Sequence, residues 1–175
     1  SGAPVAPLRL FVFRHGPAEE ADPLRGPDDS GRPLTPEGVR ETRRAARSFA
    51  KLAGPVGRIA TSPLVRARTT ADLLSTAWPK APRLEVWGEL ASGELAAPIL
   101  ERVGRTDGRR GDLVLVGHEP TLGEFVGLAV TGEAVPVCRL SKAGAALLEF
   151  PKRVVPGGAS ISWILTRKQL IARPR

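Results

Sequence analysis

Cysteine, tyrosine and long apolar runs are the features this sequence has least of. Cys138 is the single cysteine, which excludes an internal disulfide bond and argues against a zinc site built from cysteine ligands. No apolar run approaches the roughly 20 residues that span a bilayer. Aromatic residues make up 5% of the chain and none of them is tyrosine, so the sequence has no recognisable stacking pattern of an RNA-binding module.

The first residues also lack the features of an export signal. Ser1-Gly2-Ala3-Pro4 contains neither an initiator methionine nor an apolar signal core, and we interpret residues 1–7 as a loose tail or a remnant of cloning. A length of 175 residues suits one compact domain. We therefore expect a single domain over residues 8–175, with the cytoplasm as the default compartment.

Basic residues are in excess. The chain has 26 lysines and arginines against 18 acidic residues, a formal net charge of +8, and 21 of the basic residues are arginine. A positive field concentrates anions near a protein surface, which suits an anionic partner such as RNA or a phosphoprotein. Charge alone does not distinguish these partners, and replacement of lysine by arginine for compositional reasons would give the same excess.

Short apolar runs alternate with amphipathic stretches along the chain. The clearest strand covers residues 112–116 and contains the run Leu113-Val114-Leu115-Val116. The other predicted strands cover residues 8–13, 58–61, 84–87, 145–150 and 160–165. Two predicted helices begin at Thr35-Pro36 and Ser62-Pro63, and two more cover residues 95–103 and 121–130. This alternation predicts an α/β fold, a three-layer α/β/α sandwich with a mostly parallel central sheet.

The helix that follows Thr35 has the most explicit signals. Thr35 suits the N-cap, Pro36 the first helical position and Glu37 the first turn, and Gly54-Pro55 ends the helix. Its predicted core face contains Val39, Ala46, Phe49, Ala50 and Ala53, and its other faces contain Arg40, Arg43, Arg44, Arg47 and Lys51. The core face of the next helix is predicted to contain Ala67, Ala71, Leu74 and Trp78. Residues 18–34, rich in Pro, Gly and Asp without a period, are predicted to form a loop.

The two histidines of the chain each follow a predicted strand directly. His15 comes after the first strand, and His118 comes after the clearest one. In open α/β sheets, ligand sites form where the carboxyl ends of the strands meet the following helices. The helix start at Ser62-Pro63 follows a strand in the same way and brings Arg66 into its first turn. We therefore expect Arg14, His15, Arg66 and His118 to converge.

Such a set of side chains suits phosphoryl transfer through a covalent intermediate. Neutral imidazole is a good nucleophile, and a covalent intermediate divides one difficult step into two easier ones. Guanidinium groups bind phosphoryl oxygens bidentately and stabilise their charge during transfer. His118, if protonated, would add a third cation or a hydrogen-bond donor, and the helix start after Ser62 would add partial positive charge. We expect neither a metal nor another cofactor, because the protein supplies this charge itself.

The motifs around these residues resemble those of the histidine phosphatase (phosphoglycerate-mutase-like) superfamily. Arg14-His15-Gly16 resembles its RHG signature, and Leu34-Thr35-Pro36-Glu37-Gly38 its LT-x-x-G segment. Ser62-Pro63-Leu64-Val65-Arg66-Ala67 is similar to its SPLxRA motif, and Val116-Gly117-His118-Glu119-Pro120 to its second-histidine motif. Four motifs in the family's order form a specific signal, although Thr69 stands where the family often has glutamine. The short chain is most similar to the SixA-type phosphohistidine phosphatases.

This resemblance implies a phosphoglycerate-mutase-like fold and a phosphatase that forms a phosphohistidine on His15. The implied catalytic partners are Arg14, Arg66 and His118, and the implied substrate-binding residues are Gly16, Ser62 and Glu119. For the proton donor the resemblance offers two carboxyl groups. Glu89 stands where the mutase-like branch places an acid, and Glu119 stands at the position used by the acid-phosphatase branch. We favour Glu89, and we interpret Glu94 and Asp22 as surface acids.

The substrate is less defined than the site. Protein phosphohistidine is favoured, and the basic surface would then dock an acidic phosphotransfer protein. The alternative is a small phosphorylated metabolite or a nucleotide, a choice that the loop over residues 18–34 would determine. A hypothesis of another class is a basic polyanion-binding module with a vestigial pocket, which would bind RNA with a steep salt dependence and show no turnover. No membrane partner is expected, and the sequence leaves the oligomeric state open.

Overall fold

A six-stranded sheet forms the centre of the computed structural model, which describes residues 7–106 and 111–173. In chain order the strands are β1 Leu8–Arg14, β2 Arg58–Thr61, β3 Arg83–Val86, β4 Leu113–Gly117, β5 Ala145–Phe150 and β6 Ser160–Leu165. Their order across the sheet is β3-β2-β4-β1-β5-β6. The first four of these are parallel, whereas β5 is antiparallel to β1 and β6 is antiparallel to β5.

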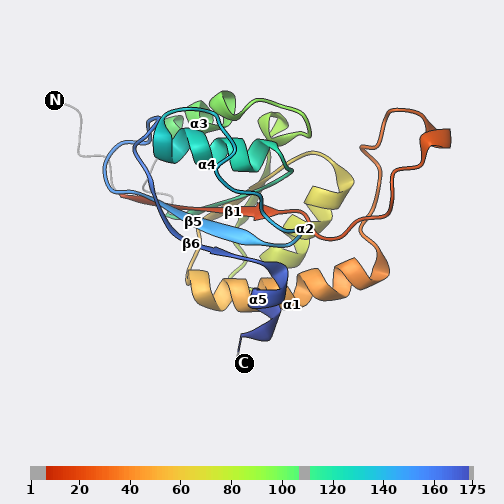
Figure 1. Cartoon of the computed structure of the whole chain (residues 1–175). Coiled ribbons are helices and arrows are strands. Elements are labelled where there is room, and N and C mark those ends of the chain that lie inside the picture. The colour runs from red at the N-terminus through yellow and green to blue at the C-terminus, as the bar shows by residue number, and fades with distance from the viewer. Residues whose placement is uncertain (1–6, 107–110, 174–175) are drawn as a thin grey trace.

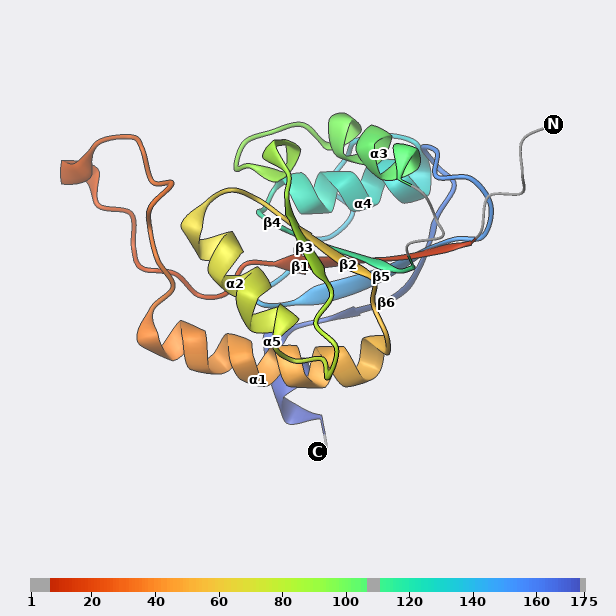
Figure 2. The same cartoon turned by 180° about the vertical axis from the view of Figure 1, so that it is seen from behind.

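Helices cover both faces of this sheet (Figure 1). One face is covered by α1 Pro36–Ala53, α2 Val65–Ser75 and α5 Arg167–Ala172, and the other by α3 Ala96–Arg105 and α4 Thr121–Thr131. The view from behind shows the same layers, and it shows the segment between β1 and α1 extending away from the body of the molecule (Figure 2). The predicted three-layer α/β/α sandwich with a mostly parallel sheet is therefore confirmed.

The alternation of side chains along β1 explains how the sheet holds both helical layers. Successive side chains of a strand point to opposite faces. Phe11 and Phe13 pack edge-on against Phe49 of α1, with ring centroids 5.3 and 5.2 Å apart. Leu10 and Val12 belong to the core on the α3 and α4 side. Because both faces are buried, β1 is a nearly continuous apolar run, as is usual for a central parallel strand.

The helix boundaries agree with the capping signals at α1 and differ at α2. The Thr35 hydroxyl accepts a hydrogen bond from the Gly38 amide at 2.9 Å, so Thr35 is the N-cap of α1. The helix after Ser62-Pro63 begins only at Val65, because the Ser62 hydroxyl accepts a hydrogen bond from the Leu64 amide and forms a turn first. Since α2 ends at Ser75, Trp78 lies outside the helix, although its side chain is buried as expected.

Three short helical segments are absent from the sequence prediction. The 3₁₀ helix η1 Pro23–Arg25 lies within the predicted loop over residues 18–34, and the 3₁₀ helix η2 Gly88–Leu90 follows β3. The third is α5, which begins with a capping box between Thr166 and Gln169. Across residues 7–106 and 111–173, none of the helices combines the length and the hydropathy needed to cross a membrane.

Candidate active site

His15 and His118 lie side by side where β1 and β4 end. Arg14 pairs with Gly117 across these parallel strands, and the His15 amide donates to the Gly117 carbonyl at 3.0 Å. The two imidazole rings are tilted by 51° with centroids 5.1 Å apart, and they are 5% and 3% exposed. The strand pattern predicted this convergence, and the geometry makes the two rings one buried pair.

The His15 imidazole is held in one tautomer. Its Nδ1 lies 2.7 Å from the carbonyl oxygen of Gly16, and a carbonyl can only accept, so Nδ1 carries the proton and the lone pair is on Nε2. Burial lowers the pKa of His15 to about 4, and the nearby charges of Arg66 and Arg14 act in the same direction against the opposing hydrogen bond to Gly16. At neutral pH His15 is thus an uncharged imidazole with a nucleophilic Nε2.

The His118 imidazole is also uncharged at neutral pH. Its Nε2 lies 2.7 Å from the Ser62 hydroxyl, whereas its Nδ1 is buried without a hydrogen-bond partner among the described residues. Burial is the main cause that lowers the pKa of His118 to about 3, and the neighbouring His15 and Arg66 add to it. Of the two roles expected for His118, a cation or a hydrogen-bond donor, this environment favours the neutral donor.

Arg66 is the most buried of the cations at this edge. Its side chain is 3% exposed, and its charge contributes to the lowered pKa of both imidazoles. One terminal nitrogen donates to the Asp29 carbonyl at 3.1 Å, and the other lies 3.4 Å from the Asp29 carboxylate. The same carboxylate accepts from Arg32 at 3.0 Å. The segment between β1 and α1 thus adds an acid and a cation to the site, neither of which we had predicted.

Arg14 is the second arginine whose charge acts on the pair. It donates to the carbonyl of Leu140 at 2.9 Å, and its charge contributes to the lowered pKa of His15 and His118. Lys142, in the segment that precedes β5, also lowers the pKa of His15 through its charge. Positive charge therefore surrounds the two neutral rings, and Lys142 is a second cation that the sequence pattern did not indicate.

Gly16 and Ser62 support other site residues. The Gly16 amide donates to the Thr70 hydroxyl at 2.9 Å, and that hydroxyl donates to the Arg66 carbonyl at 2.8 Å. A Cβ atom on Gly16 would lie 2.0 Å from the Thr42 hydroxyl oxygen, so α1 approaches this position too closely for a side chain. Since the Gly16 amide and the Ser62 hydroxyl are both engaged, these residues orient the site from within the protein.

Neither candidate proton donor is hydrogen-bonded to an imidazole in the described part of the chain. Glu89 accepts from Arg102 of α3 at 2.7 Å. Burial acts to raise the pKa of Glu89, but hydrogen bonds from its own backbone amide and from Arg102, together with the charges of Arg102 and Arg105, lower it overall. The structure therefore directs Glu89 to the α3 layer. Glu119 accepts hydrogen bonds from the backbone amides of Gly123 and Leu140 at 3.3 and 3.2 Å. Burial raises the pKa of Glu119, while both amides favour the ionised carboxylate.

Comparison with known proteins places this geometry in a family. The family model of the histidine phosphatase superfamily (branch 1) matches residues 10–107. An uncharacterized protein of Picosynechococcus sp. is 39% identical over 140 residues, which cover 78% of this chain and 82% of that relative.

The chain belongs to the histidine phosphatase superfamily.

Within this superfamily, the chain is similar to phosphohistidine phosphatase SixA of Escherichia coli, with 26% identity over 143 residues, 81% of this chain and 86% of SixA. The solved structure of the protein histidine phosphatase SixA complexed with tungstate superposes with a TM-score of 0.79 and 23% identity, covering 93% of this chain and 99% of that one. The predicted phosphoglycerate-mutase-like architecture is thus confirmed, and the family makes the chain a phosphatase.

Three site residues were not predicted from the sequence, because the sequence around them is less distinctive than the motifs of a histidine phosphatase. Asp29 and Arg32 stand just before the segment that resembles the family's LT-x-x-G motif, so their position in the chain was a hint. Lys142 stands in Ser141-Lys142-Ala143, where the backbone turns back to β1 through hydrogen bonds from the Ala143 amide to the Arg14 and His15 carbonyls. That turn can be recognised only in three dimensions.

Proposed function

We propose that this phosphatase transfers a phosphoryl group to Nε2 of His15 and acts on protein phosphohistidine. The observation that carries the first half is the neutral, single-tautomer imidazole of His15 beside His118 and the buried Arg66. The hydrogen bond from Nδ1 to Gly16 aims the lone pair away from that carbonyl and fixes which nitrogen attacks.

In the proposed first step, Nε2 of His15 attacks phosphorus while the bond from phosphorus to the leaving atom breaks and its electron pair goes to that atom. The guanidiniums of Arg14 and Arg66 balance the charge on the phosphoryl oxygens. The Nδ1 of His118 is buried and has no hydrogen-bond partner among the described residues, and in this proposal it donates to one of these oxygens when it carries the proton. In the second step, water attacks phosphorus, inorganic phosphate leaves and the neutral imidazole is restored.

The carboxyl groups near the site support phosphohistidine as the substrate. A leaving alkoxide needs a general acid, whereas a leaving imidazole can arrive already protonated. Glu89 pairs with Arg102, and Glu119 is held by two backbone amides. The pairing of Asp29 with Arg32 lowers the pKa of Asp29, so that carboxyl is ionised at neutral pH. Burial raises the pKa of Glu119, but its oxygens accept hydrogen bonds from backbone amides and, among the described residues, not from an imidazole. A site in which no carboxyl group is hydrogen-bonded to a histidine favours a substrate that needs no proton donor.

The positive charge of the site supports a mechanism that works without a metal. Arg14, Arg66 and Lys142 all influence the pKa of His15 through their charges, and such cations perform the charge stabilisation that a metal ion supplies in other phosphoryl-transfer enzymes. Protein-bound cations also keep their positions through the reaction, because α2 and the chain before β5 hold them.

The test uses a histidine-phosphorylated phosphotransfer domain and p-nitrophenyl phosphate, with EDTA present throughout. We expect EDTA-resistant phosphate release from the phosphorylated domain that disappears in His15→Ala, and slower release from the ester. His15→Ala removes the nucleophile, so it separates enzyme turnover from spontaneous loss of the labile phosphoryl group.

Three outcomes would contradict parts of this proposal. Release that persists in His15→Ala would refute the nucleophile. Faster turnover of p-nitrophenyl phosphate or of small phosphorylated metabolites than of the phosphorylated domain would favour the alternative substrate class. Loss of activity in EDTA, restored by added divalent metal, would refute metal independence.

A further inference from the structure

One face of α1 is a continuous row of exposed basic side chains. These are Arg40, Arg43, Arg44, Arg47 and Lys51, which follow one another at helical spacing; we call them the α1 basic row. An α-helix rises 1.5 Å per residue, so α1 with its 18 residues is about 27 Å long and the row from Arg40 to Lys51 covers about 17 Å of it. The row therefore runs along much of one side of the molecule.

Nothing in the described part of the chain neutralises the charge of the α1 basic row. Within the described ranges, residues 7–106 and 111–173, none of the five side chains forms an ion pair or a hydrogen bond with another side chain. Of the two acids on α1, Glu41 pairs with Arg167 at 2.7 Å, and Glu37 forms no ion pair with the row among the described residues. Unpaired charges of one sign attract an oppositely charged surface and raise its rate of association.

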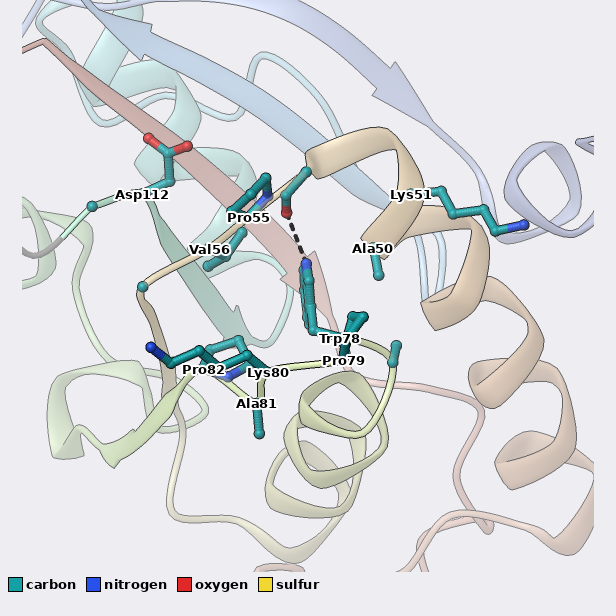
Figure 3. Close-up of a pocket in the computed structure, with 14 residues that line it drawn as sticks. Ala50, Lys51, Pro55, Val56, Trp78, Pro79, Lys80, Ala81, Pro82 and Asp112 are labelled. Atoms are coloured by element: carbon teal, nitrogen blue, oxygen red, sulfur yellow. Dashed lines mark hydrogen bonds between the residues drawn. The ribbon is translucent and has the colours of Figure 1, made fainter.

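The C-terminal end of the row meets an apolar hollow of about 850 Å³ (Figure 3). Trp78 stands in it, with its indole nitrogen bonded to the Gly54 carbonyl at 2.7 Å, and its surroundings include Val56 and Pro82. Lys51 belongs both to the row and to the lining of the hollow. The one acid of the lining, Asp112, is paired with Arg9 at 2.6 Å. We call this the Trp78 hollow.

The row connects the two ends of the molecule. At its N-terminal end, α1 begins beside the catalytic edge, where the Thr35 amide donates to the Pro17 carbonyl at 3.1 Å. The Trp78 hollow lies at the opposite edge, since its lining includes Gly57 and Pro82, which precede β2 and β3. A protein interface of ordinary size, about 800 Å² on each partner, is about as wide as α1 is long. One globular partner can therefore cover the row while it reaches the histidines.

We infer that the α1 basic row and the Trp78 hollow form one docking surface for an acidic protein, which places acidic side chains on the row and one apolar side chain in the hollow. The partner is the acidic protein that carries the phosphohistidine, so this inference rests on the proposed function. Charge complementarity gives the encounter its rate, and an apolar side chain in a pocket supplies the anchor that such interfaces use.

A protein fits this surface better than a nucleic acid does. Nucleic acids without secondary structure are bound by basic grooves together with exposed aromatic faces on which bases stack. Trp78 is 9% exposed and stands inside the hollow, where it offers a wall to an aliphatic side chain and no open face to a base. The chain contains no tyrosine that would provide another.

The experiment compares two substrates on the full chain. We would measure kcat/KM for an acidic phosphotransfer domain phosphorylated on histidine and for phosphoramidate, which has the same phosphorus–nitrogen bond without a protein surface. The row variant is Arg43→Glu with Arg47→Glu. We expect its kcat/KM for the domain to fall about tenfold or more at low ionic strength, with the difference shrinking in high salt. Its kcat/KM for phosphoramidate stays unchanged.

Matched controls separate the location of the charge from its amount. Lys152→Glu with Arg153→Glu changes the net charge equally on exposed residues between β5 and β6, and we expect less than a threefold effect. For the hollow, Ala81→Glu places a carboxylate on an exposed lining residue, and Ala97→Glu on α3 is its control. We expect Ala81→Glu, and not Ala97→Glu, to lower kcat/KM for the domain about fivefold.

The outcomes distinguish this inference from the proposed function. An unchanged kcat/KM for the domain in both the row variant and Ala81→Glu would overturn the docking surface and leave the phosphatase intact. Equal effects of the row variant and its control would show that only the net charge of the protein matters, and this result would also overturn the docking surface. If phosphoramidate is hydrolysed and the parent protein ignores the domain, the proposed substrate and the docking surface are both wrong. Retention of single-stranded RNA that the row variant abolishes, with unchanged activity on the domain, would assign the surface to nucleic acid.

Discussion

Both histidines should remain uncharged at a pH at which an ordinary histidine is protonated. The chain contains two histidines, so an NMR titration of the imidazole carbon-bound protons gives two pairs of signals, one pair from each ring, and His118→Asn assigns them. The pKa of His15 is lowered to about 4 and that of His118 to about 3, mainly by burial. The perturbation is a change of pH from 7 to 5. At pH 5 the lowered pKa values predict neutral imidazoles, whereas the ordinary pKa of histidine predicts protonated ones.

The magnitude follows from these values. At pH 5 a pKa of about 4 leaves about nine-tenths of His15 neutral, whereas an unperturbed pKa of about 6.5 would leave roughly 3% neutral. The nitrogen shifts of the neutral ring should show the proton on Nδ1 of His15, because Nδ1 donates to the Gly16 carbonyl. In Arg66→Gln both pKa values should rise, since the Arg66 charge contributes to both shifts.

Acid also destabilises the protein, and the assay must account for this. Between about pH 6.5 and 4 the unfolded chain binds protons at both histidines that the folded chain does not bind, so the free energy of unfolding falls as the pH is lowered through this range. The amide spectrum recorded at each pH reports whether the protein is still folded. A titration midpoint between 6 and 7 for either ring in the folded protein would refute the account of a buried, neutral pair.

Three further predictions concern residues that hold the site. Ser62→Ala should lower kcat about tenfold and the free energy of unfolding by about 1–3 kcal/mol, because it leaves Nε2 of His118 buried without its partner; an unchanged kcat in steady-state assays would contradict this role. Asp29→Asn should tighten inhibition by inorganic phosphate about fivefold, because it removes a negative charge that repels the phosphate. Two unit charges 4 Å apart in a water-like dielectric interact by about 1 kcal/mol. Weaker inhibition would show that the carboxylate mainly positions the arginines. Gly16→Ala should lower the melting temperature through contact with the Thr42 hydroxyl, and Thr42→Ala should restore part of the loss; equal melting of the single and double variants would exclude that contact.

The strands and the histidine pair could be predicted because they depend on local patterns. A buried parallel strand needs apolar side chains on both faces, so β1 and β4 are visible as apolar runs. Parallel strands end at a shared edge, so residues that directly follow two neighbouring strands must meet. The positions of His15 and His118 in the chain therefore contained most of the information about their distance.

The contributions of the loops could not be predicted in the same way. Asp29 and Arg32 lie in a segment without a period. The contact of Asp29 with Arg66, and its pairing with Arg32, depend on the path of that segment. Asp29 is joined to α2 partly through its neighbour, since the Val65 amide donates to the Ser30 carbonyl at 2.9 Å. No local preference of these residues encodes that approach.

The direction in which a side chain points also cannot be predicted from its position in the chain. Glu89 follows β3 as expected, but the 3₁₀ helix η2 turns its carboxylate toward Arg102, which also lies over the Trp87 ring at 4.4 Å. The short helix α5 did have a signal in the sequence, the Thr166 and Gln169 of its capping box. With six residues it is too short to show a helical period.

The most direct test of the central claim is to locate the phosphoryl group on the enzyme during turnover. The protein would be mixed with phosphoramidate, quenched in alkali and analysed by mass spectrometry of its peptides and by phosphorus NMR. The account predicts one phosphoryl group on His15, bonded to Nε2, stable in alkali and lost in acid. A phosphoryl group on another residue, or on Nδ1 of His15, would contradict the account.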